Sequence, residues 1–167
     1  GGTNVGATHS HTPENFIANT PGLKVVCPAT PYDAKGLMKS AIRDNDPVLF
    51  FEHKYLYRRI KGVMPPGDHL VPFGKARVAR EGKDLTIVTY AATVWKALEA
   101  AEQLAAEDGL SVEVLDLRTL LPMDHEAIVA SVKKTNRVLI VHEDTVTGGV
   151  AGEITAQISE RCFEWLD

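Results

Sequence analysis

The sequence lacks most of the features that mark secreted, membrane-spanning or metal-binding proteins. It has only two cysteines, Cys27 and Cys162, which stand far apart and show no zinc-binding spacing. No apolar run reaches the roughly 18 residues of a membrane span, and we expect no signal peptide and no membrane partner. The sparse cysteine usage fits a reducing compartment, so we expect a cytoplasmic protein or one from an organelle interior.

The sequence also carries no excess of positive charge. The net charge is -4 at pH 7, which argues against a nucleic-acid partner. The one local basic cluster consists of Lys54, Arg58, Arg59 and Lys61. A short solvated strip at the end of a strand is the favoured interpretation, and contact with an acidic partner is the alternative.

Alternating apolar strands and amphipathic helices predict an α/β fold. In the first half we expect strands at 23–27 and 48–52, with the second buried on both faces because it shows little alternation. Thr12 should cap a short helix that opens at Pro13, and Thr30 should cap a longer one. The second half predicts parallel βα units: strands at 75–80, 85–90, 111–117 and 137–142, and helices at 93–106, 124–134 and 150–166.

A run rich in proline and glycine separates the two halves. Residues 61–74 contain three prolines and three glycines, and we expect no regular structure there. This places the domain boundary near Asp68. The predicted division is a first domain at 1–68, a linker at 69–74 and a second domain at 75–167.

Three polar stretches follow predicted strands, where open parallel sheets gather ligands. They begin at Ala91, Arg118 and His142. Arg118 follows two acids in the sequence, Glu113 and Asp116, so for it we favour a structural ion pair over an anion clamp. For His142, with Glu143 and Asp144 behind it, we favour a hydrogen bond to a neighbouring loop over an acid/base role.

A glycine-rich loop at 147–152 leads into the last predicted helix. Such a loop could offer backbone N–H groups to a phosphate. It is not a GxGxxG motif, and it has no Walker lysine. We therefore favour glycines that let the helix pack close to its sheet.

Two stretches in the first half could carry chemistry. His9 and His11 lie on a loop that enters a helix, although a spacing of two is poor for a metal pair on a helix. Residues 41–46 end another helix. Their free carbonyls, with Asp44 and Asp46 beside them, could hold a hard cation, or they could be a solvated helix end.

Taken together, the chain resembles the beta subunit of the thiamin-diphosphate-dependent 2-oxo acid dehydrogenases, whose main members are the branched-chain and pyruvate enzymes. The resemblance covers essentially the whole chain, and its weight comes from the order and spacing of several blocks. These are His9-Ser10-His11-Thr12-Pro13-Glu14, residues 20–58, and the runs LTIVTYAATVWKALEAAE, VEVLDLRTLLPMD and RVLIVHED.

The resemblance implies a fold and an assembly. Residues 1–68 would be the later part of a pyrimidine-type thiamin-diphosphate-binding domain, followed by a truncated transketolase C-terminal-like three-layer α/β/α domain. Two alpha and two beta chains would assemble, with the cofactor between alpha and beta and with diphosphate and Mg2+ held by alpha. A lipoyl acyltransferase core and a small 2-oxo acid would be the other partners, in the mitochondrial matrix if the source is eukaryotic.

The resemblance also assigns residues. The family pattern His-Ser-Gln-Ser-Pro-Glu places its catalytic, cofactor-adjacent histidine at His9. An imidazole suits proton handling there because its pKa lies near neutrality. His11 stands where the family has glutamine and receives no role. A structural potassium site of the family falls on Ala41, Ile42, Asp44 and Asp46, where Asp46 replaces an asparagine.

The function implied is oxidative decarboxylation of a 2-oxo acid with acyl transfer to lipoamide. The chain begins without methionine and stops in or just after a helix, so we expect a piece of a longer protein. A family glutamate that protonates the aminopyrimidine would lie before Gly1, and this piece alone should be inactive. The alternatives are a single-chain transketolase-like thiamin enzyme, a non-catalytic docking module and a plain nucleotide-binding domain.

Overall fold

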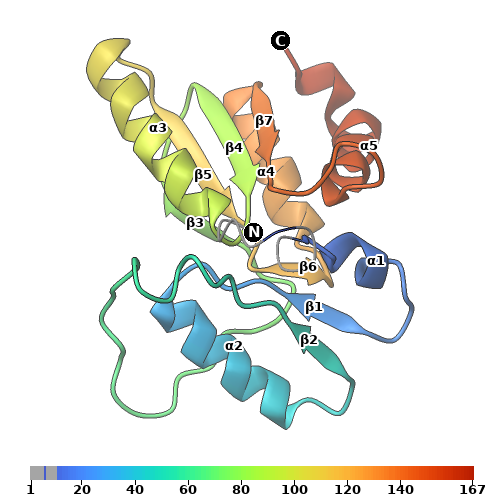
Figure 1. The fold of residues 1–167 in the computed structure, drawn as a ribbon. Coiled ribbons are helices and arrows are strands. Elements are labelled where there is room, and N and C mark those ends of the chain that lie inside the picture. The colour runs from blue at the N-terminus through green and yellow to red at the C-terminus, as the bar shows by residue number, and fades with distance from the viewer. Residues whose placement is uncertain (1–5, 7–10) are drawn as a thin grey trace.

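The molecule contains two β-sheets, and the smaller lies below the larger in the view of Figure 1. The computed structural model describes residues 6 and 11–167. One sheet has three strands in the order β2-β1-β6, and the other has four in the order β3-β5-β4-β7. Within the described residues, no helix is long and apolar enough to cross a membrane.

The smaller sheet is built around β1 (Lys24–Val26) and β2 (Val48–Phe50), which pair in parallel. The segment that connects these two strands contains α2 (Pro31–Arg43). Thr30 caps α2 as predicted, because its Oγ1 accepts the Asp33 N–H at 3.1 Å. The prediction that 48–52 is buried on both faces is wrong: β2 is a three-residue edge strand, and all three residues are half-buried.

The first helix begins later than its sequence indicates. α1 (Glu14–Ala18) has Pro13 as its N-cap, and no side chain caps it, so the predicted Thr12 cap is wrong. Pro13 lies just outside the helix, at φ -89° and ψ 8°. Its side chain is a hydrocarbon ring, which cannot accept a hydrogen bond from the free N–H groups of the first turn. Glu14 at the first position turns inward and is buried.

The larger sheet has parallel β4 (Leu85–Thr89), β5 (Val112–Asp116) and β7 (Val138–Val141). β3 (Arg77–Arg80) runs antiparallel to β5, so the all-parallel prediction is wrong for this strand. The reason is the short connection from β3 to β4, which reverses the chain. It passes so close to the start of β5 that a Cβ on Gly82 would lie 2.1 Å from the Glu113 nitrogen.

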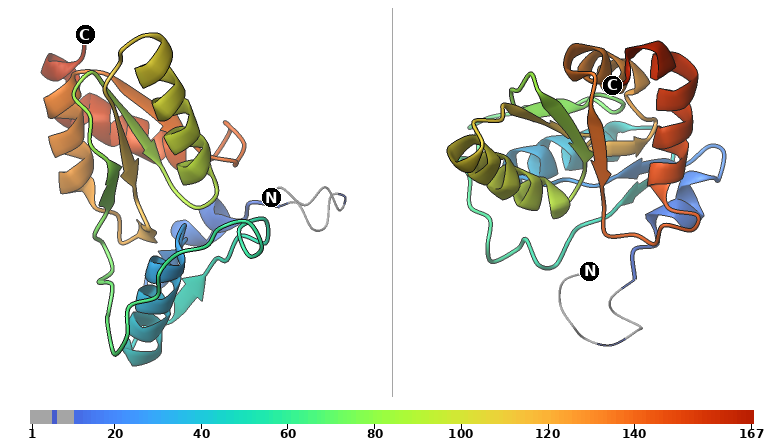
Figure 2. Two further views of the ribbon diagram at one scale, coloured as in Figure 1. Left: turned by 90° about the vertical axis from the view of Figure 1, so that its left-hand side faces the viewer. Right: turned by 90° about the horizontal axis from the view of Figure 1, so that it is seen from above.

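Helices cover both faces of the larger sheet, as the three-layer prediction requires (Figure 2). α3 (Thr93–Glu107) packs on one face, while α4 (His125–Thr135) and α5 (Val150–Cys162) pack together on the other. Neighbouring residues of β4 point to opposite faces: Ile87 joins the core under α3, and Val88 joins the core under α4 and α5. A 3-10 helix, Phe163–Trp165, replaces the predicted end of α5.

The second half of the chain supplies one strand to the first half's sheet. β6 (Thr119–Leu121) follows β5 directly and pairs antiparallel with β1. The Cys27 N–H donates to the Arg118 carbonyl at 2.8 Å and extends this junction. Residues 51–76, which include the predicted linker, form no helix or strand.

A network of ion pairs joins the two halves beside β6. Asp33, in the first turn of α2, is fully buried, and its Oδ1 lies 2.8 Å from Nη2 of Arg118. The Arg77 Nε lies 3.6 Å from the other Asp33 oxygen, and the Arg77 Nη2 donates to Asp116 at 3.1 Å. Burial raises the pKa of Asp116 to about 6, and Arg77 opposes this effect.

Asp33→Asn should lower the free energy of unfolding by about 2–4 kcal/mol, because it leaves Arg118 facing a buried site without its carboxylate and removes one of the two carboxylates that Arg77 faces. Urea denaturation followed by tryptophan fluorescence measures the change. The Trp95 indole N–H donates to the Ala29 carbonyl across the same junction, so it reports on it. Asp108→Asn, at an exposed position, is the matched control and should stay within about 0.5 kcal/mol of wild type.

The Asp116 carboxyl should make stability depend on pH. Its folded pKa of about 6 exceeds the ordinary aspartate value of about 3.9, so the folded state holds this proton more tightly than the unfolded chain does. Stability relative to Asp116→Asn should therefore fall by up to about 3 kcal/mol between about pH 4 and pH 6 and stay flat above that. Urea unfolding of both proteins across this range measures it. Parallel pH curves would show that Asp116 titrates normally in the folded state.

Candidate functional site

A cavity of about 150 Å³ lies where the two halves meet, and its walls carry several titratable side chains, of which Glu14 is buried. The segment 11–14 at the start of α1 and the segment 51–54 after β2 form one side. Ala91, after β4, and Glu143, after β7, form the other. Because the carboxyl ends of parallel strands meet at one edge of a sheet, two of the three predicted strand-end stretches converge here.

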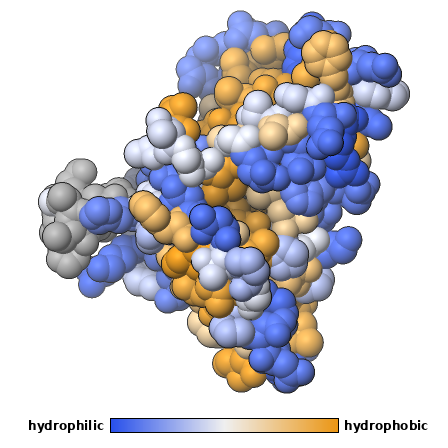
Figure 3. All heavy atoms as spheres, turned by 90° about the vertical axis from the view of Figure 1, so that its right-hand side faces the viewer, coloured by the Kyte–Doolittle hydropathy of each residue, from blue (hydrophilic) through white to orange (hydrophobic). Residues whose placement is uncertain are grey.

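A second hollow, of about 360 Å³, lies between α1, β6 and the start of α5. Apolar side chains gather in a band on the face of the molecule that carries these helices (Figure 3). Among the described residues, the walls of this second hollow carry two titratable side chains, His125 and Glu153, so it offers less chemistry than the smaller cavity.

Glu14 is the buried acid of the smaller cavity. Its side chain is only 8% exposed, and its Oε2 has no hydrogen-bond partner in the part of the chain that the structure describes. Burial raises the pKa of Glu14, and the negative charges of Asp144 and Glu143 add to the effect. A carboxyl in this state holds its proton to a higher pH than an exposed carboxyl does, and shifted pKa values of this kind are common among functional groups.

Tyr90, at the end of β4, lies against the same group of acids. Its hydroxyl is buried without a hydrogen-bond partner among the described residues. Burial raises the pKa of Tyr90, followed by the effect of Glu14. The phenol therefore stays protonated, and it presents a hydrogen-bond donor inside the junction.

A close contact joins the halves across the cavity. Nε2 of His53 lies 2.6 Å from Oε2 of Glu143, and the His53 side chain is 9% exposed. This hydrogen bond lowers the pKa of Glu143. His53 was not among the predicted residues, because it follows β2 of the smaller sheet and meets Glu143, which follows β7 of the larger sheet, only across the junction between the sheets.

His142 behaves as predicted. Its Nδ1 accepts the Asp144 N–H at 3.0 Å, so the imidazole is bonded to the loop that follows it. Its ring stacks on that of Tyr90, with 6.3 Å between centroids. In the glycine-rich loop, Gly149 allows a close approach within the loop itself, since a Cβ there would lie 2.3 Å from the Thr145 carbonyl oxygen. A Cβ on Gly152, in α5, would meet nothing within 4 Å, so the prediction that these glycines let the helix pack close to its sheet is not supported.

Arg118 forms the ion pair that was predicted, but with a different partner. The sequence suggested Glu113 or Asp116, which precede it closely. Glu113 instead pairs with Lys134 on α4, and Arg118 pairs with Asp33 from the other half. The left-handed backbone of Arg118, at φ 59°, turns its side chain out of the sheet and toward α2.

The structure describes one of the two histidines predicted on the loop before α1. His9 lies outside the described residues. His11 is exposed and lines the cavity, beside Thr12 and Pro13. The structure places Glu143, from the predicted stretch that begins at His142, on the cavity wall, and it adds Glu14, His53 and Tyr90 to the predicted set.

The predicted cation site at the end of α2 already has a positive partner. The Lys24 ammonium lies 2.6 Å from an Asp44 oxygen and 2.9 Å from an Asp46 oxygen. These hydrogen bonds raise the pKa of Lys24 and lower that of Asp44. Across the described residues, no three histidine, cysteine or acidic side chains cluster as a metal site would require. Both carboxylates are thus paired with an ammonium in this arrangement, and the potassium site stays a prediction.

Two known families match the chain, one in each half. Residues 1–60 match the family described as the transketolase pyrimidine binding domain. Residues 74–167 match the family described as the transketolase C-terminal domain. Among solved structures, a split-gene transketolase described as an inactive beta4 tetramer superimposes with a TM-score of 0.76 at 30% identity, covering 89% of this chain and 48% of that one.

Several curated proteins are similar over the whole chain. The 2-oxoisovalerate dehydrogenase subunit beta of Bacillus subtilis is 54% identical over 167 residues, which are 100% of this chain and 51% of that protein. The pyruvate dehydrogenase E1 component subunit beta of the same organism is 48% identical, with the same coverage. The beta subunit of acetoin:2,6-dichlorophenolindophenol oxidoreductase from Cupriavidus necator is 48% identical over 97% of this chain and 47% of its own. The chain thus spans about half the length of the curated relatives it matches.

Glu14→Gln should stabilise the protein increasingly as pH rises. The raised pKa means that the folded wild type keeps its proton while the unfolded chain loses it, so wild-type stability falls as pH rises through the folded pKa. Glutamine does not titrate and avoids this loss. Urea unfolding at about pH 4 and about pH 8 measures the difference, with the exposed Glu102→Gln as control. An equal difference at both pH values would show that Glu14 is not perturbed.

Proposed function

The chain belongs to the transketolase family, with its pyrimidine-binding and C-terminal domains, and we propose that it forms part of the beta subunit of a thiamin-diphosphate-dependent 2-oxo acid dehydrogenase. The observation that carries this proposal is the 54% identity, over every residue of the chain, to the 2-oxoisovalerate dehydrogenase beta subunit. The proposed reaction is oxidative decarboxylation of a branched-chain 2-oxo acid or of pyruvate, with the acyl group passed to lipoamide.

The cavity residues fit part of the cofactor. An aminopyrimidine ring needs an apolar face and hydrogen-bond partners for its nitrogen atoms. Phe51 lines the cavity, and the unbonded Glu14 Oε2 is a buried acceptor without a donor among the described residues. When bound, thiamin diphosphate supplies the electron sink for decarboxylation.

The roles that we propose for this chain's residues concern protons. His9 would hold and release a proton near the reacting carbon, since an imidazole titrates near neutral pH. Burial raises the pKa of Glu14, so its carboxyl would keep the cavity wall uncharged or would form a hydrogen bond to the ring. The contact of His53 with Glu143 would hold the two domains at a fixed separation around the cofactor.

The assembly that we propose has an alpha subunit facing this site, where it would hold the diphosphate and Mg2+. A second beta chain and a lipoyl acyltransferase core would be the other protein partners. The enzyme would lie in the cytoplasm, or in the mitochondrial matrix of a eukaryote. A potassium ion, if it binds, would depend on the backbone carbonyls of Ala41 and Ile42, because Lys24 pairs with both carboxylates.

The alternative closest in chemistry is a single-chain transketolase-like enzyme, and a non-catalytic docking module is the alternative of another class. The first would need a diphosphate-binding domain on the same polypeptide, whereas the proposed enzyme needs a separate alpha chain. The second would show a normal complex without turnover. One assay on the natural full-length chain therefore separates all three.

We expect the natural full-length beta chain, co-expressed with its alpha partner, to decarboxylate 2-oxo acids only when thiamin diphosphate is present. His9→Ala should lower kcat at least about 100-fold, because a positioned proton-transfer group contributes that much. The measurement is dye-coupled decarboxylation of pyruvate and of branched-chain 2-oxo acids. His125→Gln, at the start of α4 and outside the cavity, is the control and should keep wild-type turnover.

Two results would contradict the proposal. One is an intact complex that binds thiamin diphosphate and has no activity toward either substrate class. The other is wild-type turnover in His9→Ala, which would remove the role proposed for this histidine. Activity that needs no alpha partner would favour the single-chain alternative.

A further inference from the structure

A basic loop, here defined as residues 54–61, gathers four exposed cations on one segment of the chain. Its four cations are Lys54, Arg58, Arg59 and Lys61, and no acidic residue occurs between residues 53 and 67. The chain has a net charge of -4, so the remaining residues carry -4 - (+4) = -8. Positive charge is therefore concentrated on this loop in an otherwise acidic protein.

None of these cations has an ion-pair partner in the part of the chain that the structure describes, whereas Lys24, Lys39 and Lys134 all do. All four side chains are exposed. Their charge is available to another molecule, and no internal pair would have to be broken first.

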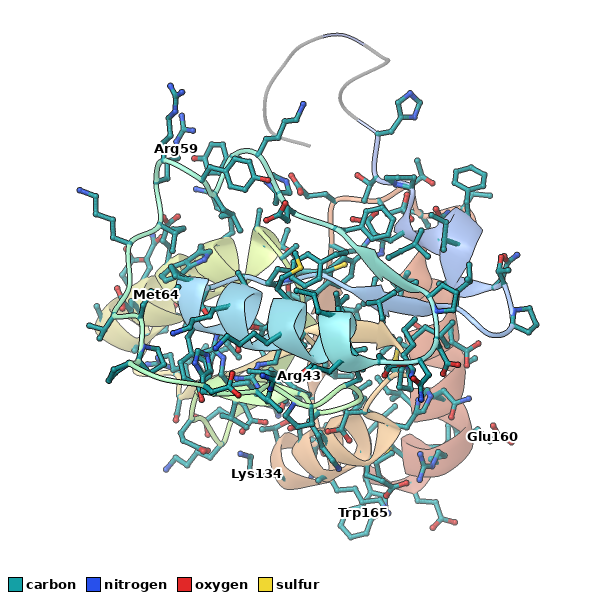
Figure 4. All side chains as sticks on the ribbon, turned by 90° about the horizontal axis from the view of Figure 1, so that it is seen from below. Arg43, Arg59, Met64, Lys134, Glu160 and Trp165 are labelled. Carbon is teal, nitrogen blue, oxygen red and sulfur yellow. The ribbon has the colours of Figure 1, made fainter. Side chains whose placement is uncertain are left out.

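The loop has a defined conformation. The Leu56 N–H donates to the His53 carbonyl at 2.9 Å, and the Ile60 N–H donates to the Leu56 carbonyl at 3.0 Å. Leu56 is buried beneath these turns and anchors them. The Arg59 guanidinium lies 3.9 Å from the Tyr55 ring centroid, and its side chain projects away from the ribbon in Figure 4. Ordered cations lose less conformational entropy on binding.

An apolar hollow lies beside the cations. It has a volume of about 220 Å³, and from the loop it is lined by Leu56, Tyr57 and Ile60. Pro31 and Ala34 of α2 form the opposite wall. An apolar centre with a charged rim is the usual anatomy of a protein–protein contact.

The loop is also continuous with the candidate site. Lys54 lines the site cavity, while Glu52 and His53 line both that cavity and the apolar hollow. A molecule bound on the loop would therefore sit next to the cavity where the proposed reaction takes place. The proposed reaction requires a second protein, the bearer of the lipoyl group, to come this close.

We propose that the basic loop is the docking surface for an acidic segment of the protein that carries the lipoyl acceptor. This inference rests on the proposed function. The cations attract the acidic segment and speed its encounter with the enzyme, and the hollow takes an apolar side chain from the same segment. The lipoyl arm is then presented to the cavity from the adjoining Lys54 side.

The test is the double variant Arg58→Glu/Arg59→Glu in the alpha–beta holoenzyme, with Lys54 left in place because it lines the cavity. The control is Lys75→Glu/Lys83→Glu, two exposed lysines for which the described residues offer no ion pair. Both variants change the net charge equally. Decarboxylation is measured with a small dye as acceptor and, separately, with the lipoyl protein as acceptor.

We expect the loop variant to lose at least about tenfold in kcat/KM for the lipoyl protein and to show a weaker dependence on salt, while the dye-linked rate stays at the wild-type level. The control should keep both rates. A loop variant that matches the control with the lipoyl protein would overturn the docking surface.

Other outcomes are equally decisive. If the loop variant fails to assemble with the alpha chain in gel filtration, the loop is a subunit interface and the docking proposal is wrong. If the assembled wild-type holoenzyme shows no dye-linked activity, the proposed function itself fails, which separates that failure from one confined to the loop.

Discussion

The buried carboxylate of Asp33 is the interaction on which the arrangement of the two halves depends. It is fully buried, and arginines from two different segments of the second half reach it: Arg77 from β3 and Arg118 from the turn between β5 and β6. A charge in such a place is tolerated only when it is paired. The pairing fixes the first turn of α2 against the strand ends of the other sheet, beside the point where β6 joins β1.

The hydrophobic core continues across the same junction. Val26 of β1 faces α2, whereas its neighbours Val25 and Cys27 belong to the core that includes Val88 and Ile154 of the second half. The smaller sheet is thus packed on one side by its own helix and on the other by the second domain. The site cavity lies at the edge of this shared core, so its geometry is set by both domains together.

Local patterns were enough to predict most elements. The helix start at Thr30–Pro31 and the apolar periodicity of 93–106 and 124–134 depend only on residues a few positions apart in the sequence. They could not give β6, which is three residues long and is stabilised only by pairing with β1, almost a hundred residues earlier. For the same reason the sequence located Glu143 and His142 on a strand end but missed His53. The His53 contact with Glu143 exists only once the two sheets are stacked.

The size of the cavity bears on how the proposed site would be completed. About 150 Å³ is well below the roughly 300–1,000 Å³ of typical small-molecule sites. The walls formed by the described residues supply an aromatic face, a buried acid and an interdomain histidine, but they include no cluster of cations suited to a diphosphate. A cofactor with one aromatic end and one dianionic end would therefore need a second surface that brings positive charge or a metal ion. The proposed alpha subunit, facing the cavity, would provide that second surface.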